Sequence, residues 1–421
     1  MKMMRAKYFT IRLLIVYHAD SKTKNNVFRG GYIMNSFKYH VPTPIYFGRG
    51  VVKEKAKMIC GYGTRAFIVT IKFQGGCENK ALKDVEEILN EAGIPFKVND
   101  NVIENPPTES CVEIFLDALD FKPDFIFGIG GGSSIDTAKA VNYLFQHPEI
   151  NTTEAATDLF FNSKVNFYDL TGSAGAFPLV AIPTTAGTGA DVTAAAVITR
   201  NDVGTKATIK ANLYATATFL DSAYVEESPA FLIHTGVLDA LAHAMETYMN
   251  VKTSWMARKV AEMEFELFAQ FKDNLLADTL TEENFDQMIL GASIAGSAMM
   301  QSGTTLPHGL GYPLSQFHHV NHGLSCSITL GEYMRTFKDQ TLPQKVMKMC
   351  GFKDTQDMCD FFQEIIKRDL KLEVTRAEID QWTDFFWETE QNNRLKRNPE
   401  PISKEQIHEM YLKSLAPYIV D

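Results

Sequence analysis

The order of hydrophobic and polar positions divides the chain into two parts of different texture. From about residue 44 to 225, short continuous apolar runs alternate with helical patterns such as residues 81–92. Continuous apolar runs are typical of strands buried on both faces, so this part predicts a parallel sheet covered by helices. The runs that predict strands are residues 66–70, 95–98, 125–129, 179–183 and 217–221.

After about residue 226, long helical patterns dominate and predict an all-α second domain. These patterns occupy residues 238–250, 254–276, 281–300 and 355–370. We therefore expect an α/β domain at residues 34–225 and a helical domain at residues 226–421. Residues 1–33 are expected to be an N-terminal extension outside the fold, with Met34 as an alternative start. Their basic-then-apolar order is typical of a signal peptide, but Arg12 interrupts the apolar run and no small-residue cleavage site follows.

A strand, a glycine turn and a helix start follow one another at residues 125–139. Glycines permit positive φ and let a ligand approach the backbone closely. The amides at the start of the next helix, together with its positive end, form a seat for a pyrophosphate. A tight turn without any ligand explains a lone glycine cluster equally well. The residues of this turn are Gly130, Gly131, Gly132 and Ser133, with Asp136 and Lys139 on the following helix.

A second glycine turn follows another apolar strand, at residues 182–191. It offers the hydroxyls of Thr184, Thr185 and Thr188, while Gly187 and Gly189 open the backbone. A dinucleotide lying across the crevice of a parallel sheet needs two such turns at strand ends. The pair therefore predicts a Rossmann-like, dinucleotide-binding N-terminal domain.

Six of the ten histidines fall between residues 234 and 322, in the helical part of the chain. Asp239 and His243 are four apart in a helical pattern, where they can chelate one divalent cation or simply hydrogen-bond to each other. His308 and His322 each precede a glycine, which suits an imidazole that points into a cleft. One Asp and three His suit Fe(II) or Zn(II) and leave a position for a substrate oxygen.

The remaining histidines of this segment carry a weaker signal. We interpret His318 and His319 as loop residues near a metal site rather than ligands. His234 is nine residues before His243 and would lie on the opposite helix face, so we expect a hydrogen-bonded structural residue there.

Composition narrows the function without identifying it. With 45% hydrophobic residues in a chain of 421, there is enough material for a large core, which excludes a disordered chain. A net charge of −10 argues against nucleic-acid or anionic-membrane partners. Six cysteines without a CxxC pair favour free, mostly structural thiols in a reducing, cytoplasmic compartment. The sequence contains no run of about 18 apolar residues, so no membrane-spanning helix is predicted.

Four ordered motifs together resemble the iron-containing (group III) alcohol dehydrogenase family. They are residues 130–139, 183–189 and 239–248 and the pair of His308 and His322, and the resemblance covers roughly residues 44–420. It implies a homodimer of two-domain subunits, each with its site in the cleft between an α/β dinucleotide-binding domain and an all-α metal-binding domain. It implies metal ligands at Asp239, His243, His308 and His322. It also implies a nicotinamide dinucleotide on the two glycine turns, with Asp136, Lys139, Thr184, Thr185, Thr188 and Lys206 as neighbouring contacts.

Two departures from the family pattern affect the chemistry. Many members carry a second histidine four residues after the first His-Gly histidine, where it is thought to help proton transfer. Here that position is Tyr312, which becomes the candidate for this role and leaves the proton path open. Members that prefer NAD often carry Asp where this chain has Ile71 followed by Lys72. We therefore expect NADP to be favoured over NAD.

The resemblance implies a metal-dependent oxidoreductase that interconverts a primary alcohol and its aldehyde with NAD(P)(H), with iron expected and zinc as the alternative. A glycerol or polyol dehydrogenase of the same architecture is an alternative. A dehydroquinate-synthase-like lyase is disfavoured because residues 303–323 contain no Lys or Arg for a phosphorylated substrate. A catalytically silent metal or nucleotide binder is the alternative from a different class.

Overall fold

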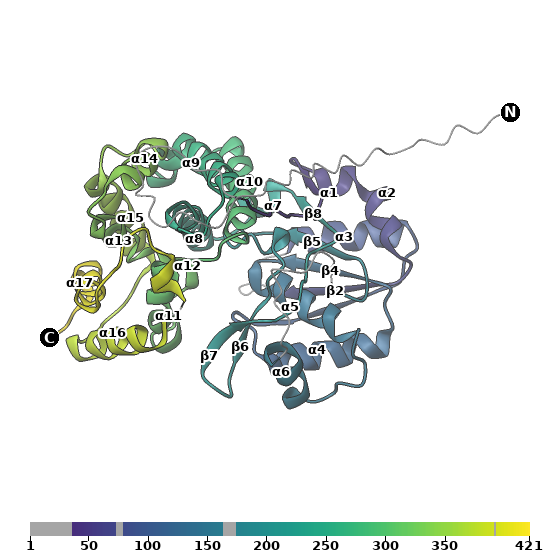
Figure 1. Cartoon of the computed structure of the whole chain (residues 1–421). Helices are drawn as coiled ribbons and strands as arrows, with labels where there is room; N and C mark the ends of the chain where they lie inside the picture. The colour runs from purple at the N-terminus through teal and green to yellow at the C-terminus, as the bar shows by residue number, and fades with distance from the viewer. Residues whose placement is uncertain (1–35, 73–78, 163–173, 391–392) are drawn as a thin grey trace.

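Six parallel strands form the central sheet of the N-terminal domain, in the order β1-β8-β5-β4-β2-β3 (Figure 1). The computed structural model describes residues 36–72, 79–162, 174–390 and 393–421. The parallel sheet predicted from the apolar runs is confirmed. Its strands are β1 (Ile45–Phe47), β2 (Ala66–Ile71), β3 (Phe96–Val102), β4 (Phe125–Gly130), β5 (Leu179–Pro183) and β8 (Ala217–Leu220).

Helices cover both faces of this sheet, which explains why its central strands are apolar throughout. Along β2, Phe67 and Val69 pack on one face, against a core that includes residues of three helices, α4 (Thr108–Phe121), α5 (Gly132–Leu144) and α6 (Thr153–Phe161). Ala66 and Ile68 pack on the other face, where the helices are α1 (Val51–Glu54), α2 (Ala56–Ile59), α3 (Lys80–Glu91) and α7 (Ser222–Glu226). Successive strand residues point to opposite faces, so both sets must be apolar.

A hairpin that the apolar pattern did not predict extends from this domain. Its strands are β6 (Val197–Arg200) and β7 (Thr205–Thr208), paired antiparallel, with Gly204 at φ +63° in the turn. Both strands are short and largely polar, and Ile198 is the only one of their residues that is fully buried. In Figure 1 the hairpin extends toward the helical domain. The side-chain amide of Gln316 in that domain donates a hydrogen bond to the carbonyl of Gly204.

The second domain is helical, as predicted. Its central helix, α8 (Ala230–Met249), begins eight residues before the predicted start at residue 238, because residues 233–249 are buried on all sides and lack an amphipathic period. The surrounding helices are α9 (Trp255–Leu276), α10 (Glu282–Met299), α11 (Leu306–Phe317), α12 (His322–Ser327), α13 (Leu330–Thr336), α14 (Thr341–Met349), α15 (Thr355–Asp369), α16 (Arg376–Glu390) and α17 (Lys404–Ser414).

The two domains meet at the second glycine turn. A Cβ on Gly187 would lie 2.8 Å from the Cα of Gly236 in α8. A Cβ on Gly189, which has φ +59°, would lie 2.5 Å from the Cα of Gly296 in α10. The sequence pattern suggested that these glycines make room for a ligand, but at these two contacts they make room for helices of the other domain.

Two further expectations concern the whole chain. The expected N-terminal extension, residues 1–33, lies outside the described residues, and so does Cys77. The other cysteines are all free thiols, as expected: Cys60, Cys111, Cys326, Cys350 and Cys359. None of the helices in the described ranges is long and apolar enough to span a membrane.

Candidate active site

A cavity of about 510 Å³ lies between the two domains. The α/β domain lines it with both glycine turns and the hairpin, and the helical domain lines it with residues of α8, α11 and α12. The residues that carry the two predicted functions, dinucleotide binding and metal binding, therefore face the same space. Such an interdomain cavity is the usual place for a ligand site.

The first glycine turn lies at the carboxyl end of β4. Gly130 has φ +138°, and a Cβ there would lie 2.5 Å from the Oγ of Ser134, so this position requires glycine. Helix α5 begins directly afterwards at Gly132 and directs its free amides toward the cavity, where Gly131 and Ser133 are lining residues. This geometry suits an anionic ligand such as a pyrophosphate.

The second glycine turn packs directly against the first. A Cβ on Gly131 would lie 3.1 Å from the Oγ1 of Thr185, and one on Gly132 would lie 2.7 Å from the Cγ2 of Thr188. Glycine at both positions therefore lets the threonine side chains approach the helix start. The structure thus brings together two turns that are about fifty residues apart in the sequence.

The residues predicted to contact a dinucleotide fall into two groups. Gly131, Gly132, Ser133, Asp136, Thr184, Thr185, Thr188, Lys206 and Ile71 line the cavity. Among the described residues, Gly130, Lys139 and Lys72 are not part of that lining.

Lys139 has a different environment from the one its motif suggested. Its side chain is buried, and Nζ donates to the backbone carbonyls of Ala190, Thr193 and Ala195 at 2.6–2.8 Å. Burial lowers the pKa of this amine. The three bonds hold the loop after the second glycine turn against α5. Asp136, one turn before Lys139 on α5, accepts a hydrogen bond from the amide of Val197 at 2.9 Å, and burial raises the pKa of its carboxyl to about 6.

The four residues predicted as metal ligands converge at the other end of the cavity. Asp239 and His243 project from the same face of α8, while His308 lies in the first turn of α11 and His322 begins α12. The Oδ1 of Asp239 lies 3.8 Å from His243 Nε2, 3.6 Å from His308 Nε2 and 3.9 Å from His322 Nε2. The rings of His243 and His308 stack with centroids 4.6 Å apart.

The protonation states of Asp239, His243 and His322 suit a cation, whereas the neighbouring Cys326, Glu246 and Asp239 raise the pKa of His308 well above its ordinary value despite its burial. Burial alone would raise the pKa of Asp239, but the surrounding imidazoles hold it below its ordinary value, so the carboxylate is charged. Burial lowers the pKa of His243, and it lowers that of His322 to about 3, so both imidazoles keep a free lone pair. Within the described part of the chain, the buried atoms Asp239 Oδ1 and His308 Nε2 have no hydrogen-bond partner. Buried donors and acceptors are normally satisfied, and a divalent cation would satisfy both atoms here.

Glu246 is a residue of this site that the sequence reasoning missed. It is fully buried on α8, and its carboxylate accepts a hydrogen bond from His308 Nδ1 and two from Thr305, from the amide at 2.6 Å and from Oγ1 at 3.1 Å. In the neutral ring, the bond to Nδ1 selects the tautomer of His308 in which Nε2 presents its lone pair to the cluster. Glu246 follows Asp239 by seven residues, which places both side chains on the same face of the helix. This spacing could have identified Glu246 from the sequence.

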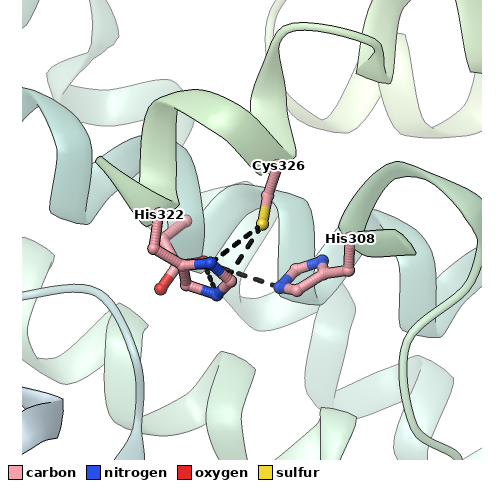
Figure 2. A group of neighbouring side chains, drawn as sticks. His308, His322 and Cys326 are labelled. Atoms are coloured by element: carbon pink, nitrogen blue, oxygen red, sulfur yellow. Dashed lines mark hydrogen bonds and ion pairs between the residues drawn. The ribbon is translucent and has the colours of Figure 1, made fainter. Parts of the chain in front are cut away.

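Cys326 is the second residue that was missed. It is fully buried on α12, with its Sγ 3.4 Å from Nδ1 and 3.7 Å from Nε2 of His322. One ligand atom from each of Asp239, His308, His322 and Cys326 lies within 4.8 Å of all the others, and the predicted ligand His243 is not a member of this group. In Figure 2, His308, His322 and Cys326 point toward one another. The cysteine pattern favoured mostly structural thiols and did not single out Cys326, although this residue is four positions after His322.

Tyr312 lines the cavity from α11. Its hydroxyl oxygen accepts a hydrogen bond from Nη2 of Arg394 at 2.8 Å, and the guanidinium carbon lies 4.9 Å from the ring centroid. Arg394 also forms an ion pair with Glu390. Tyr312 therefore stands beside a fixed cation that can stabilise negative charge on its oxygen.

Basic side chains reach the cavity from segments outside residues 303–323. Residues 303–323 carry none, but Lys206 on β7 and Arg394 and Arg397 line the same space. The lack of Lys and Arg that was counted against a lyase therefore does not extend to the whole cavity. The last two residues are about eighty positions from Tyr312, so sequence spacing gives no signal for them.

Three other histidines lie outside the ligand cluster. Nδ1 of His234 hydrogen-bonds the carboxylate of Asp369 at 2.8 Å, which confirms the structural role predicted from helix periodicity. Nε2 of His318 pairs with Glu378 at 3.1 Å, and His319 has φ +53° in the turn after α11.

Comparisons with known proteins agree across most of the chain. The family "Iron-containing alcohol dehydrogenase" matches residues 42–222, and "Fe-containing alcohol dehydrogenase family, C-terminal" matches residues 232–415. The bifunctional aldehyde-alcohol dehydrogenase AdhE of Escherichia coli (strain K12) is 29% identical over 305 residues, which are 72% of this chain and 34% of that protein. The chain thus matches about a third of that relative's length.

Two further relatives match over most of their own length. The NADPH-dependent butanol dehydrogenase of Clostridium saccharobutylicum is 29% identical over 326 residues, which are 74% of this chain and 76% of that protein. The crystal structure of an iron-containing alcohol dehydrogenase from Thermotoga maritima superposes with a TM-score of 0.77 at 27% identity, over 90% of this chain and 100% of that one.

Proposed function

The chain belongs to the iron-containing alcohol dehydrogenase family, and we propose that it interconverts a primary alcohol and its aldehyde with a nicotinamide dinucleotide. One observation carries this proposal. Asp239 Oδ1 and His308 Nε2, buried atoms with no hydrogen-bond partner among the residues that the structure describes, lie in the same cavity as two glycine turns suited to a pyrophosphate. A redox reaction between a coenzyme and a metal-activated oxygen needs this juxtaposition.

Asp239, His243, His308 and His322 would hold a divalent cation, with Fe(II) as our first assignment and Zn(II) as the alternative. When bound, the cation acts as a Lewis acid that polarises the aldehyde carbonyl or lowers the pKa of the alcohol. Glu246 orients His308 for this task through its bond to Nδ1. The family name supports iron, whereas imidazole and carboxylate donors suit both metals.

The dinucleotide is assigned to the glycine turns. The amides of Gly131, Gly132 and Ser133 at the start of α5 hold the pyrophosphate, and Thr185 and Thr188 close over it. Lys206 extends from β7 into the cavity, where it reaches the part of the coenzyme nearest the metal ligands.

NADP is our assignment for the coenzyme. Ile71 ends β2 at the cavity, and the exposed Lys72 follows it, so no carboxylate stands at this position to repel a 2′-phosphate. The name of the similar butanol dehydrogenase, which is NADPH-dependent, supports the same choice.

Tyr312 is our candidate for moving the proton. Because Arg394 donates to the phenolic oxygen, the Tyr312 hydroxyl proton is free to point into the cavity. During aldehyde reduction this proton passes to the oxygen of the product alcohol, and the nearby guanidinium stabilises the phenolate that remains.

A single plate assay tests the activity. The full chain, loaded separately with Fe(II) and Zn(II), is mixed with NADH or NADPH and with aldehydes of several chain lengths, and loss of reduced coenzyme is followed by absorbance. We expect oxidation of the coenzyme by aldehydes, faster with NADPH. Glycerol with oxidised coenzyme is the control for a polyol dehydrogenase, and binding of coenzyme without any turnover would support a silent binder instead.

We also propose that the enzyme is a homodimer. Strand β1 lies at the edge of the sheet, and its Ile45 and Phe47 are 41% and 43% exposed. An edge strand with exposed apolar side chains favours pairing with another chain. Light scattering coupled to size exclusion would measure the mass, and a mass of 47.2 kDa at working concentration would contradict the dimer.

A further inference from the structure

Two helices each present a pair of potential ligands to the same point. Helix α8 carries Asp239 and His243, and α12 carries His322 and Cys326. In both pairs the residues are four apart, so their side chains lie on one face of the helix and can bind the same ion. The family resemblance accounts for the first pair and for His322, but gives no role to Cys326.

The distances around Cys326 match those between ligands of one ion. Atoms bound 2.0–2.3 Å from a common cation lie roughly 3–4.5 Å apart. Sγ lies 3.7 Å from His322 Nε2, compared with 3.6–3.9 Å for the distances from Asp239 Oδ1 to the three histidine Nε2 atoms. The sulfur therefore lies as far from its neighbour as the proposed ligands lie from theirs, in a group whose ligand atoms are all within 4.8 Å of one another.

The surroundings of the Cys326 thiol are those of a metal ligand rather than those of an ordinary core cysteine. A structural buried cysteine packs among apolar groups. Cys326 instead faces His322, and it belongs to a cluster in which Asp239 Oδ1 and His308 Nε2, on side chains only 3–4% exposed, have no hydrogen-bond partner within the described ranges. These two unpartnered atoms are independent evidence that a ligand belongs at this point.

Building on the metal-dependent function proposed above, we propose that Cys326 is a fifth protein ligand of the cation, bound through its sulfur. Its proton leaves to solvent when the metal binds, because only the thiolate coordinates. A six-coordinate cation with five protein ligands still accepts one substrate oxygen. A soft sulfur ligand also raises the affinity of the site for zinc relative to a site of harder donors.

Cobalt(II) is the probe that tests this assignment directly. The full chain is stripped with a chelator and reloaded with one equivalent of Co(II), and its absorption spectrum is recorded. A thiolate ligand gives a sulfur-to-cobalt charge-transfer band in the near ultraviolet, which carboxylate and imidazole ligands do not give. We expect this band in the parent protein, its loss in Cys326→Ser, and a cobalt affinity lowered by about tenfold or more in that variant.

Cys359→Ser is the matched control, because Cys359 is a half-buried free thiol on α15 outside the cluster, and its removal must leave the band unchanged. X-ray absorption at the cobalt edge of the parent provides a test that does not depend on any variant folding. A sulfur neighbour supports the assignment, and a shell of only nitrogen and oxygen overturns it.

The result also separates this inference from the proposed function. A cobalt-loaded parent that reduces aldehydes but lacks the band, or a Cys326→Ser variant that keeps the band, overturns the ligand assignment alone. A parent that binds no cobalt and oxidises no coenzyme overturns both.

Discussion

The two ends of the interdomain cavity are built by different means. At the end that belongs to the α/β domain, the predicted ligand contacts are mainly backbone amides exposed by glycines, supported by threonine hydroxyls. At the other end, the contacts are side chains of Asp239, His308 and His322 on three helices. A backbone site is sensitive to the addition of atoms, whereas a side-chain site is sensitive to their removal. Substitutions can therefore address the two ends separately.

Removal of a ligand at the side-chain end should have the largest effect. His308→Ala should abolish stoichiometric metal binding and lower turnover on the order of 10³-fold or more, because Lewis-acid catalysis contributes several kcal/mol. Metal content by elemental analysis and kcat for aldehyde reduction are the measurements. His408→Ala, on α17 beside Asp380, is the control with the same chemical change outside the cavity. Full activity of the His308 variant would refute the side-chain site.

Glu246→Gln tests whether Glu246 holds His308 in place, without removing any of the proposed metal ligands. The amide cannot accept all three bonds from His308 and Thr305, so the imidazole is held less firmly. We expect metal affinity to fall by about 10- to 100-fold, with the KM for coenzyme unchanged. Glu264→Gln is the matched control. That carboxyl is equally buried in the helical domain, and burial raises its pKa well above the ordinary value, so the change to an amide is small. Equal metal affinities in the two variants would contradict the role of Glu246.

Gly132→Ala tests the backbone end by adding one atom. The new Cβ would lie 2.7 Å from Cγ2 of Thr188 and would push the two turns apart at the proposed pyrophosphate seat. The KM for coenzyme should rise about tenfold, or ~1.4 kcal/mol, while metal content stays at the parent level. Gly61→Ala is the control, because a Cβ there meets nothing within 4 Å. A loss of metal in the Gly132 variant would show that the two ends are not separable.

A substitution at the end of β2 concerns coenzyme choice, and its expected effect is no larger than that of Gly132→Ala. Lys72→Asp places a carboxylate after β2, where it repels a 2′-phosphate and can accept a bond from a free ribose hydroxyl. We expect the ratio of kcat/KM for NADPH to that for NADH to fall about tenfold. Lys57→Asp, at an exposed position on α2 rather than at the end of β2, makes the same change of charge and should leave the ratio unchanged. If the Lys72 and Lys57 variants had the same ratio, the 2′ group of the coenzyme would have to bind somewhere other than beside residue 72.

Most of the fold could be predicted from the sequence because the patterns that indicate its strands, turns and helices are local. Continuous apolar runs identified β2, β4, β5 and β8, and the glycine turns follow two of these strands directly. The spacing of Asp239 and His243 on one helix face is equally local, and the structure brings both near His308 and His322. The β6–β7 hairpin was missed because short polar strands carry little apolar signal.

Contacts between distant segments could not be predicted in this way. The packing of Gly187 on Gly236 requires knowing that the second turn meets α8, and the approach of Arg394 to Tyr312 requires the path of the last quarter of the chain. Lys139 is instructive because its motif suggested a ligand contact, whereas its buried amine binds three carbonyls. Glu246 and Cys326 were within reach of helix periodicity, but no pattern of residue types drew attention to them.

The contact of Gly187 with Gly236 has a consequence for how substrates enter and products leave. Because main chain meets main chain there without intervening side chains, this contact should oppose sliding of one domain over the other. An opening of the cavity would then be a rotation of the domains near this contact and that of Gly189 with Gly296. The hydrogen bond from Gln316 to the carbonyl of Gly204 in the hairpin turn also joins the two domains, and it would have to break in such a rotation, which would slow the exchange of ligands.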